Sequence, residues 1–253
     1  MIIYYFIILI ILLYLIYIVY IKVKYPFWSI QPVYHKYDTL YKWKKPHIID
    51  KLPLLNKYCN FLAVKTSVFD ELSNEDKQII VNFINTHYLR TTNVNYIPTL
   101  ESFNTQFSNH SLSSFISTYT QPKMLINYET QKYIDSKEIL AVITSRPVYI
   151  TINNTNIVAN YIDYMCVHES YRKKGFAEEI IQTHNFNQCQ KNKNVVISLF
   201  KHEDINSCIK PVVEYYTYAY LKVKVNKLHP SINIFLVTPQ SFTLILHFIK
   251  ENK

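Results

Sequence analysis

An uninterrupted apolar segment opens the chain. Every one of residues 1–21 is Met, Ile, Tyr, Phe, Leu or Val. At about 1.5 Å per residue, a helix of this length covers roughly 30 Å, the thickness of the hydrocarbon core of a bilayer. A cleavable signal peptide has a basic segment before its apolar run and small residues after it, and this sequence has neither. The pattern therefore predicts an uncleaved transmembrane helix over residues 1–21.

A lysine-rich segment follows the apolar one. Because an excess of lysine and arginine stays on the cytosolic side of a membrane, we expect a single-pass protein whose C-terminal domain lies in the cytosol. Residues 22–59 also contain several prolines, which predicts an extended juxtamembrane arm. The lysines that crowd the flank of the apolar segment are Lys22, Lys24, Lys36, Lys42, Lys44 and Lys45, and the prolines of the arm are Pro26, Pro32, Pro46 and Pro53.

The polar and apolar positions of residues 60–253 predict one α+β domain. Ser73 is a good helix N-cap, and an apolar stripe at helical spacing follows it. Asn153-Asn154 separates two β-rich segments and predicts a tight turn, because Asn tolerates positive φ. Residues 93–109 are polar and predict a loop. Helices are predicted over 73–88, 111–118, 177–188 and 211–221, and strands over 60–66, 124–128, 138–143, 148–152, 157–167, 195–200, 232–237 and 242–248.

Composition narrows the possible partners. The formal charge is +9, which the lysines after the apolar segment explain as attraction to anionic lipid. No recognised nucleic-acid-binding module accompanies the charge, so we expect no nucleic-acid partner. The four cysteines form no close pair, so neither a metal site nor a disulfide framework is predicted. A single glycine among abundant Asn, Lys, Ile and Tyr indicates an AT-rich coding sequence, typical of a large DNA virus or an AT-rich parasite. For a viral protein, the membrane would be that of the virion or an internal membrane of the host.

The candidate chemistry lies where a predicted strand meets a predicted helix. The strand ends in Cys166-Val167-His168, and Arg172-Lys173-Lys174-Gly175-Phe176-Ala177 leads into the helix. Unpaired N–H groups at a helix N-terminus, a residue without Cβ and nearby cations suit a pyrophosphate. An ordinary strand-to-helix turn with solvated basic residues would give the same pattern, and this alternative stays open.

Three segments resemble a known family. Arg-x-x-Gly-x-Ala after a strand is similar to the acyl-CoA pyrophosphate loop of GNAT acyltransferases. Cys166-Val167-His168 followed by Arg172 resembles N-myristoyltransferase, whose strand reads Leu-Cys-Val-His before a basic loop. The segment Phe27-Trp28-Ser29-Ile30-Gln31-Pro32-Val33 is similar to a Phe-Trp-x-Thr-Gln-Pro-Val segment of that family. Lys210-Pro211-Val212 resembles the start of a later helix there, and Arg146-Pro147 a turn between strands.

The resemblance implies a fold, a ligand and a set of site residues. The fold would be a GNAT-like mixed sheet flanked by helices, preceded here by one transmembrane helix. The co-substrate would be an acyl-CoA, myristoyl-CoA in that family, without a metal. The backbone N–H groups of Tyr164 and Met165 would form an oxyanion hole for the thioester. The residues that would bind the acyl-CoA are Tyr25, Phe27, Trp28, Val167, Arg172, Lys173, Lys174, Gly175, Phe176 and Ala177.

The departures from the family leave the activity open. N-myristoyltransferase has a second half that supplies the peptide groove and the base, so we expect a second protein chain to complete the peptide site. Gly175 stands where that family usually has a basic residue. Asp163 should point to the face opposite Tyr164, and core packing is the favoured role of the other polar candidates. These are Cys166, His168, Glu214, Tyr216 and Tyr218. The chain is thus predicted to be a membrane-anchored N-acyltransferase, a catalytically inactive membrane scaffold of the same fold, or a basic adaptor on anionic membranes.

Overall fold

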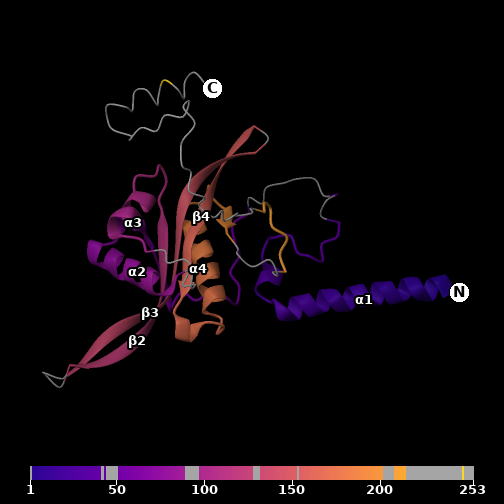
Figure 1. Ribbon diagram of the computed structural model, residues 1–253, viewed down its shortest axis with the longest axis horizontal. Helices are drawn as coiled ribbons and strands as arrows, with labels where there is room; N and C mark the ends of the chain where they lie inside the picture. The colour runs from indigo at the N-terminus through magenta and orange to yellow at the C-terminus, as the bar shows by residue number, and fades with distance from the viewer. Residues whose placement is uncertain are drawn as a thin grey trace, which may run out of the picture. The chain divides into compact units, whose positions relative to one another are not determined.

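The computed structural model describes residues 2–40, 43, 51–88, 97–127, 132–152, 154–201, 208–214 and 247 (Figure 1). The chain divides into two compact units, Met1–Pro211 and Val212–Lys253. The helices, sheet and cavity discussed below belong to the first unit. In the second unit, Val212, Val213 and Glu214 are not helical, so the helix predicted over 211–221 is wrong at its start. The rest of that helix, Tyr216, Tyr218 and the strands predicted over 232–237 and 242–248 lie outside the described residues.

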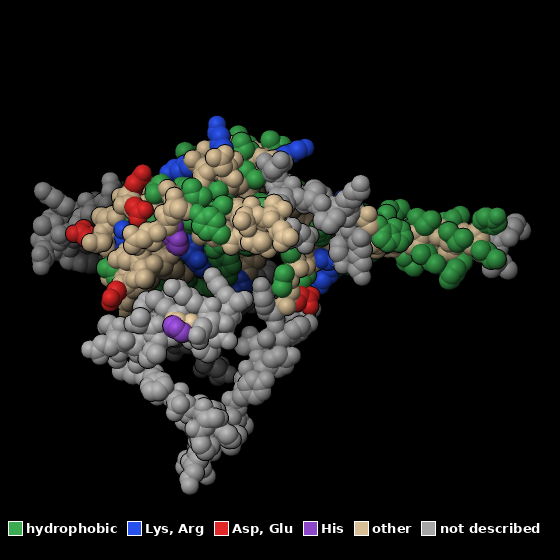
Figure 2. All heavy atoms as spheres, turned by 90° about the horizontal axis from the view of Figure 1, so that it is seen from above, with side chains coloured by type: hydrophobic (Ala, Val, Ile, Leu, Met, Phe, Trp, Pro, Cys, Tyr) green, Lys and Arg blue, Asp and Glu red, His purple; other side chains and the backbone are tan. Residues whose placement is uncertain are grey.

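Helix α1, Ile2–Lys24, contains the predicted apolar segment. Over Ile3–Lys24 it is long and apolar enough to cross a membrane, and its side chains are almost all exposed. In Figure 2 hydrophobic side chains cover its visible face. A signal sequence near an N-terminus can also be long and apolar enough to meet this criterion.

The segment after α1 packs back on the helix and on the domain. The Tyr14 hydroxyl donates a hydrogen bond to the carbonyl of Tyr37, and the Lys22 ammonium lies 5.9 Å from the centroid of the Tyr37 ring. Trp28–Ile30 form a short 3-10 helix, η1. An isolated antiparallel bridge joins His35 to Ile209. Among its described residues, the predicted arm is therefore only partly extended.

A five-stranded mixed sheet forms the centre of the domain. Its order is β1-β2-β3-β4-β5, in which the first three pairs are antiparallel and β4 and β5 are parallel. This confirms the predicted mixed sheet flanked by helices. The strands are β1 (Val64–Val68), β2 (Phe115–Asn127), β3 (Lys132–Ile152), β4 (Thr155–Val167) and β5 (Ser198–Phe200).

Two sequence predictions for the sheet are wrong. The helix predicted over 111–118 is replaced by the start of β2, where the β-branched and aromatic residues from Phe115 onward pair with β1 and β3. The turn expected at Arg146-Pro147 is the interior of β3. Proline is tolerated there because the pairing of β3 with β2 stops at the Phe115–Ser145 pair, which leaves the β2 side of Pro147 without a strand partner.

Helices cover both faces of the sheet. Helices α2 (Asn74–His87) and α3 (Leu100–Phe107) pack on one face around Phe69, Phe103 and Phe107. Helix α4 (Phe176–Lys191) packs on the other face through Ile180. The loop predicted over 93–109 is wrong for α3, because Thr99 and Ser102 form a capping box that begins a helix.

A hairpin turn and a β-bulge shape β4. Asn154 has φ of +63°, as the predicted turn requires. Further along, the register between β3 and β4 shifts between Ile143 and Ser145, so that Thr144 faces both Asp163 and Tyr164. Such a bulge bends the strand and redirects its side chains.

Candidate acyl-CoA site

The parallel pair of the sheet opens at the bulge. Strand β5 pairs with β4 only at Asn160, Tyr161 and Ile162. Beyond Ile162, none of the described residues continues this pairing along the edge of β4. Among the described residues, the backbone groups on that edge therefore have no strand partner.

Of the two predicted oxyanion-hole donors, only one points to the open edge. The Tyr164 N–H donates to the Thr144 hydroxyl, 3.0 Å away, on the β3 side. The Val167 carbonyl instead accepts from Arg172 Nε at 3.3 Å, on the open side. Because backbone groups alternate along an antiparallel strand, Met165, two residues before Val167, presents its N–H to the open edge.

The loop after β4 holds two residues in the left-handed region. A short 3-10 helix, η4 (Glu169–Tyr171), precedes them. Lys173 has φ of +60°, and Gly175, the N-cap of α4, has φ of +89°. A Cβ built on Gly175 would meet nothing within 4 Å. The glycine is therefore needed for its backbone angle and not for lack of space.

This loop presents a series of unsatisfied donors. The first α4 bond across the cap runs from the Glu179 N–H to the Gly175 carbonyl, 3.2 Å away. Among the described residues, no protein acceptor takes the N–H groups of residues 173–178. Successive N–H groups without an acceptor, at and just before the positive end of a helix dipole, are suited to an anion.

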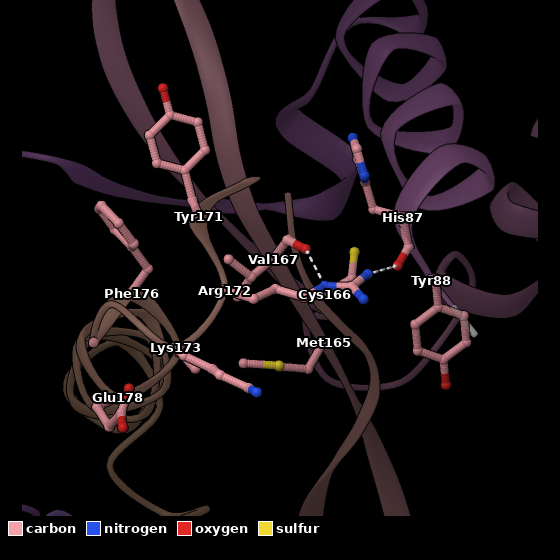
Figure 3. Close-up of a pocket in the computed structure, with 12 residues that line it drawn as sticks. His87, Tyr88, Met165, Cys166, Val167, Tyr171, Arg172, Lys173, Phe176 and Glu178 are labelled. Atoms are coloured by element: carbon pink, nitrogen blue, oxygen red, sulfur yellow. Dashed lines mark hydrogen bonds between the residues drawn. The ribbon is translucent and has the colours of Figure 1, made fainter. Parts of the chain in front are cut away.

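A cavity of about 460 Å³ lies beside these donors (Figure 3). It is bounded by the end of α2, the end of β4, the loop and the start of α4. Lys173 adds positive charge to its wall, and Glu178 adds one carboxylate. Seven predicted site residues line it, namely Met165, Val167, Arg172, Lys173, Gly175, Phe176 and Ala177.

Arg172 fastens the cavity wall at two points. Besides its bond to the Val167 carbonyl, its Nη2 donates to the His87 carbonyl at the end of α2, 2.9 Å away (Figure 3). The guanidinium thus holds the end of β4 and the end of α2 together. Its remaining N–H groups leave it capable of facing a phosphate as well.

The other predicted site residues lie outside this cavity. Tyr164 packs in the aromatic cluster on the α2 and α3 face, and Lys174 lies over the Tyr171 ring. Phe27 is buried, with its ring 5.1 Å from that of Tyr58. Trp28 lies 6.3 Å from the ring of Phe200 on β5. Tyr25 is bonded through its N–H to the Ile21 carbonyl at the end of α1.

The candidate acid–base groups are held in structural contacts. Burial raises the pKa of the Cys166 thiol to about 12, so it is not a nucleophile at neutral pH. Asp163 accepts from Arg146 Nε at 2.8 Å. Burial raises the pKa of the Asp163 carboxyl, and Arg146 and a hydrogen bond from Gln106 oppose that effect.

The predicted orientation of Asp163 is wrong. Gln106 on α3 lies close enough to the Asp163 side chain to lower the pKa of that carboxyl, and it accepts from the Tyr164 hydroxyl at 2.8 Å. Both side chains therefore lie on the α3 face. The bulge explains this, because two residues facing one break the alternation of sides that a regular strand would impose.

Four residues that line the cavity were not predicted: His87, Tyr88, Tyr171 and Glu178. Tyr171 and Glu178 flank the recognised motif, so its neighbourhood could have suggested them. His87 and Tyr88 come from α2, about eighty residues earlier. No local pattern indicates that the end of α2 meets the end of β4.

The fold and the site define a class of protein, a mixed α/β domain in which a short parallel strand pair lies beside the N-terminus of a helix and a cavity. The particular family follows from its sequence profile. The profile described as "Myristoyl-CoA:protein N-myristoyltransferase, N-terminal domain" matches residues 55–204, more than half of the chain. The chain belongs to this family.

Comparison with individual proteins gives distant likenesses only. No curated protein sequence matches the chain. N-myristoyltransferase of Saccharomyces cerevisiae, in a structure with bound myristoyl-CoA, is 22% identical with a TM-score of 0.40. The match covers 65% of this chain and 38% of that one. A GNAT family acetyltransferase of Staphylococcus aureus is 14% identical with a TM-score of 0.38, over 62% of this chain and 100% of that one.

Proposed function

We propose that this chain binds a long-chain acyl-CoA, with the diphosphate at the head of α4. The observation that carries the proposal is the run of N–H groups at residues 173–178 beside the cavity. The left-handed conformations of Lys173 and Gly175 support it, because they turn the backbone donors toward the ligand. Lys173 and Arg172 supply the matching charge.

The thioester would lie along the open edge of β4. There the Met165 N–H would donate to the thioester carbonyl, and a well-placed donor of this kind lowers a reaction barrier by about 3–4 kcal/mol. The Tyr164 N–H could join it only after its bond to Thr144 opens. Binding is therefore proposed with one oxyanion donor in place and the second held by Thr144.

Helix α1 is proposed to anchor the domain to a membrane, with the domain on the cytosolic side. If the contact between Tyr14 and Tyr37 persisted, only the part of α1 before Tyr14 could enter the membrane. The twelve residues from Ile2 to Leu13 would make a helix of only about 18 Å, which is too short to cross the hydrocarbon core. A bilayer-spanning position therefore requires this contact to open. The anchored protein would thus carry its arm, from Tyr25 onward, at the membrane surface.

Two outcomes of acyl-CoA binding are proposed as alternatives. In the first, the chain transfers the acyl group to a protein amine, with a second protein chain completing the acceptor site. In the second, it is an inactive scaffold that retains the ligand. Two observations favour the second alternative: Asp163 is engaged by Arg146, and the Tyr164 N–H is engaged by Thr144.

Calorimetry on the full chain in detergent micelles tests binding. We expect myristoyl-CoA to bind more tightly than CoA, and CoA more tightly than myristate, because the diphosphate meets the backbone donors. Binding should also weaken as salt is raised, since it includes ion pairing. Absence of heat with both CoA compounds, while circular dichroism shows a folded chain, would overturn the proposal. Mass spectrometry of a glycine-ended peptide incubated with chain and myristoyl-CoA then separates enzyme from scaffold.

A further inference from the structure

The end of the arm and the turn that follows it expose large apolar side chains that do not belong to the proposed acyl-CoA site. Leu54 and Leu55 are 84% and 64% exposed, and Phe61 and Leu62 are 49% and 102% exposed. We refer to these four residues as the apolar loop. Four exposed large hydrophobic residues within nine positions mark an interaction site more often than an ordinary surface.

The apolar loop is exposed although its base is firmly held. The Asn60 N–H donates to the Thr183 hydroxyl on α4 at 2.9 Å, and Asn60 Nδ2 donates to Glu179 at 2.7 Å. The Phe61 ring lies 5.5 Å from that of Phe186, also on α4. A loosely held backbone therefore does not explain the exposure of the Leu62 side chain, because hydrogen bonds from Asn60 to α4 fix the start of the turn.

The apolar loop lies close to the end of α1. Helix α1 ends at Lys24, and Phe27, three residues later, packs its ring 5.1 Å from that of Tyr58, between the two halves of the loop. The chain that leaves α1 is therefore held against the segment of the apolar loop only three residues after the helix ends.

The charge of the segment that contains the first part of the apolar loop indicates which kind of surface the loop contacts. Residues 22–60 contain eight lysines and two aspartates, a net +6 out of the formal +9 of the whole chain. Lys57 lies within the loop itself, with its ammonium 5.2 Å from the Tyr58 ring centroid. Exposed apolar side chains next to a lysine-rich segment of the chain are typical of regions that lie in the interface of an anionic bilayer.

We infer that the apolar loop is a second membrane contact, which inserts Phe61 and Leu62 into an anionic lipid surface beside the anchor. This inference rests on the proposed anchoring by α1. The loop and the anchor together would fix the outer side of α4 toward the membrane, since the loop is bonded to α4 through Asn60. Helices α2 and α3, on the other face of the sheet, would then point away from the lipid.

Tryptophan fluorescence of the full chain in vesicles tests this orientation. Leu62→Trp and the control Ile79→Trp, at a 54% exposed position on α2, are each compared with the unaltered chain. The vesicles contain phosphatidylserine and lipids brominated on the acyl chains. We expect the added tryptophan at position 62 to be quenched at least twofold more than the one at position 79. Equal quenching at both positions would overturn the inference.

The remaining outcomes separate this inference from the proposals on which it rests. If alkaline carbonate extracts the chain from vesicles, the anchor fails, and quenching at position 62 is then judged against the control as before. A tryptophan at position 62 that is unquenched by lipid, but whose emission shifts with protein concentration, would show that a second copy covers the loop and would overturn the inference. Acyl-CoA affinity should be the same in Leu62→Trp and the unaltered chain, so failure of binding is recognised independently.

Discussion

Helix α4 has two polar regions, and they differ in whether their polar groups are hydrogen-bonded within the protein. In its buried middle, His184 Nδ1 lies 2.8 Å from the Ser117 hydroxyl and His184 Nε2 lies 3.0 Å from the Ser145 hydroxyl. Ser145 in turn donates to Gln188 at 2.7 Å. At the head of the same helix, the N–H groups of residues 173–178 have no protein acceptor among the described residues.

The difference separates polar groups that are bonded within the fold from polar groups that are left to solvent or to the proposed anion. Buried polar groups are nearly always hydrogen-bonded, because leaving one unpaired costs about 1–3 kcal/mol. The network around His184 meets that requirement internally and joins α4 to β2 and β3. The loop at the head of α4 meets it only through solvent or an anion. Substitutions in the first region should change stability, and substitutions in the second should change affinity.

The largest effect is expected from His184→Leu. The change leaves the Ser117 and Ser145 hydroxyls without their imidazole partner in a buried site, so we expect the free energy of unfolding to fall by about 3–5 kcal/mol. Chemical denaturation of the full chain in detergent measures it. Gln190→Leu, at an exposed position on the same helix, should change stability by less than about 0.5 kcal/mol. Similar losses in both variants would contradict the structural role of the network.

Acid should destabilise the same region. Burial lowers the pKa of His184 to about 3, from an ordinary value of 6.5. The unfolded chain therefore takes up a proton below pH 6.5 that the folded chain refuses until about pH 3. Stability from this group is complete above pH 6.5 and falls as the pH drops, by about 1.4 kcal/mol per pH unit, or roughly 2 kcal/mol at pH 5. Denaturation curves between pH 7 and 5 measure it, and His184→Leu should lack this part of the slope.

The smallest effect is expected from substitutions of Gly175, in the loop at the head of α4, and it concerns the affinity for acyl-CoA. An L-residue with a Cβ is strained by about 1–2 kcal/mol at the backbone angle of Gly175, and Asn tolerates that angle best. If the loop relaxes away from this geometry, Gly175→Val should weaken acyl-CoA binding about tenfold, whereas Gly175→Asn should weaken it twofold or less. Calorimetry compares the two. Equal affinity of Gly175→Val and the unaltered chain would mean that the loop geometry does not matter for the ligand.

The sequence predicted the elements whose signals are local. Helix α2 was predicted from Ser73, whose hydroxyl accepts from the Asp76 N–H as expected of an N-cap. Helix α3 was missed because it is only eight residues long and most of them are polar, although Leu100, Phe103 and Phe107 give it an apolar face. The start of β2 was missed because its pairing with β1 and β3 outweighs the polar residues just before it.

The same distinction applies to the candidate site. The basic loop and its glycine were predicted because the motif occupies six consecutive residues. The bulge opposite Thr144 could not be predicted, since it depends on the register between two strands. The bulge decides that the side chains of Asp163 and Tyr164 share a face. The roles assigned to Tyr25, Phe27 and Trp28 remain predictions.

The residues described with a left-handed backbone conformation indicate where the backbone of this chain is strained. Besides its one glycine, Asn109, Asn154 and Lys173 have φ between +60° and +63°. Proteins with more glycine commonly use it at such positions, because an L-residue is disfavoured there. Among the described residues, a composition nearly free of glycine therefore places a small strain in three separate turns. Those turns are the natural starting points for making a sturdier variant, and Lys173, the longest of the three side chains, is the one whose retention beside the cavity calls most for a reason other than stability.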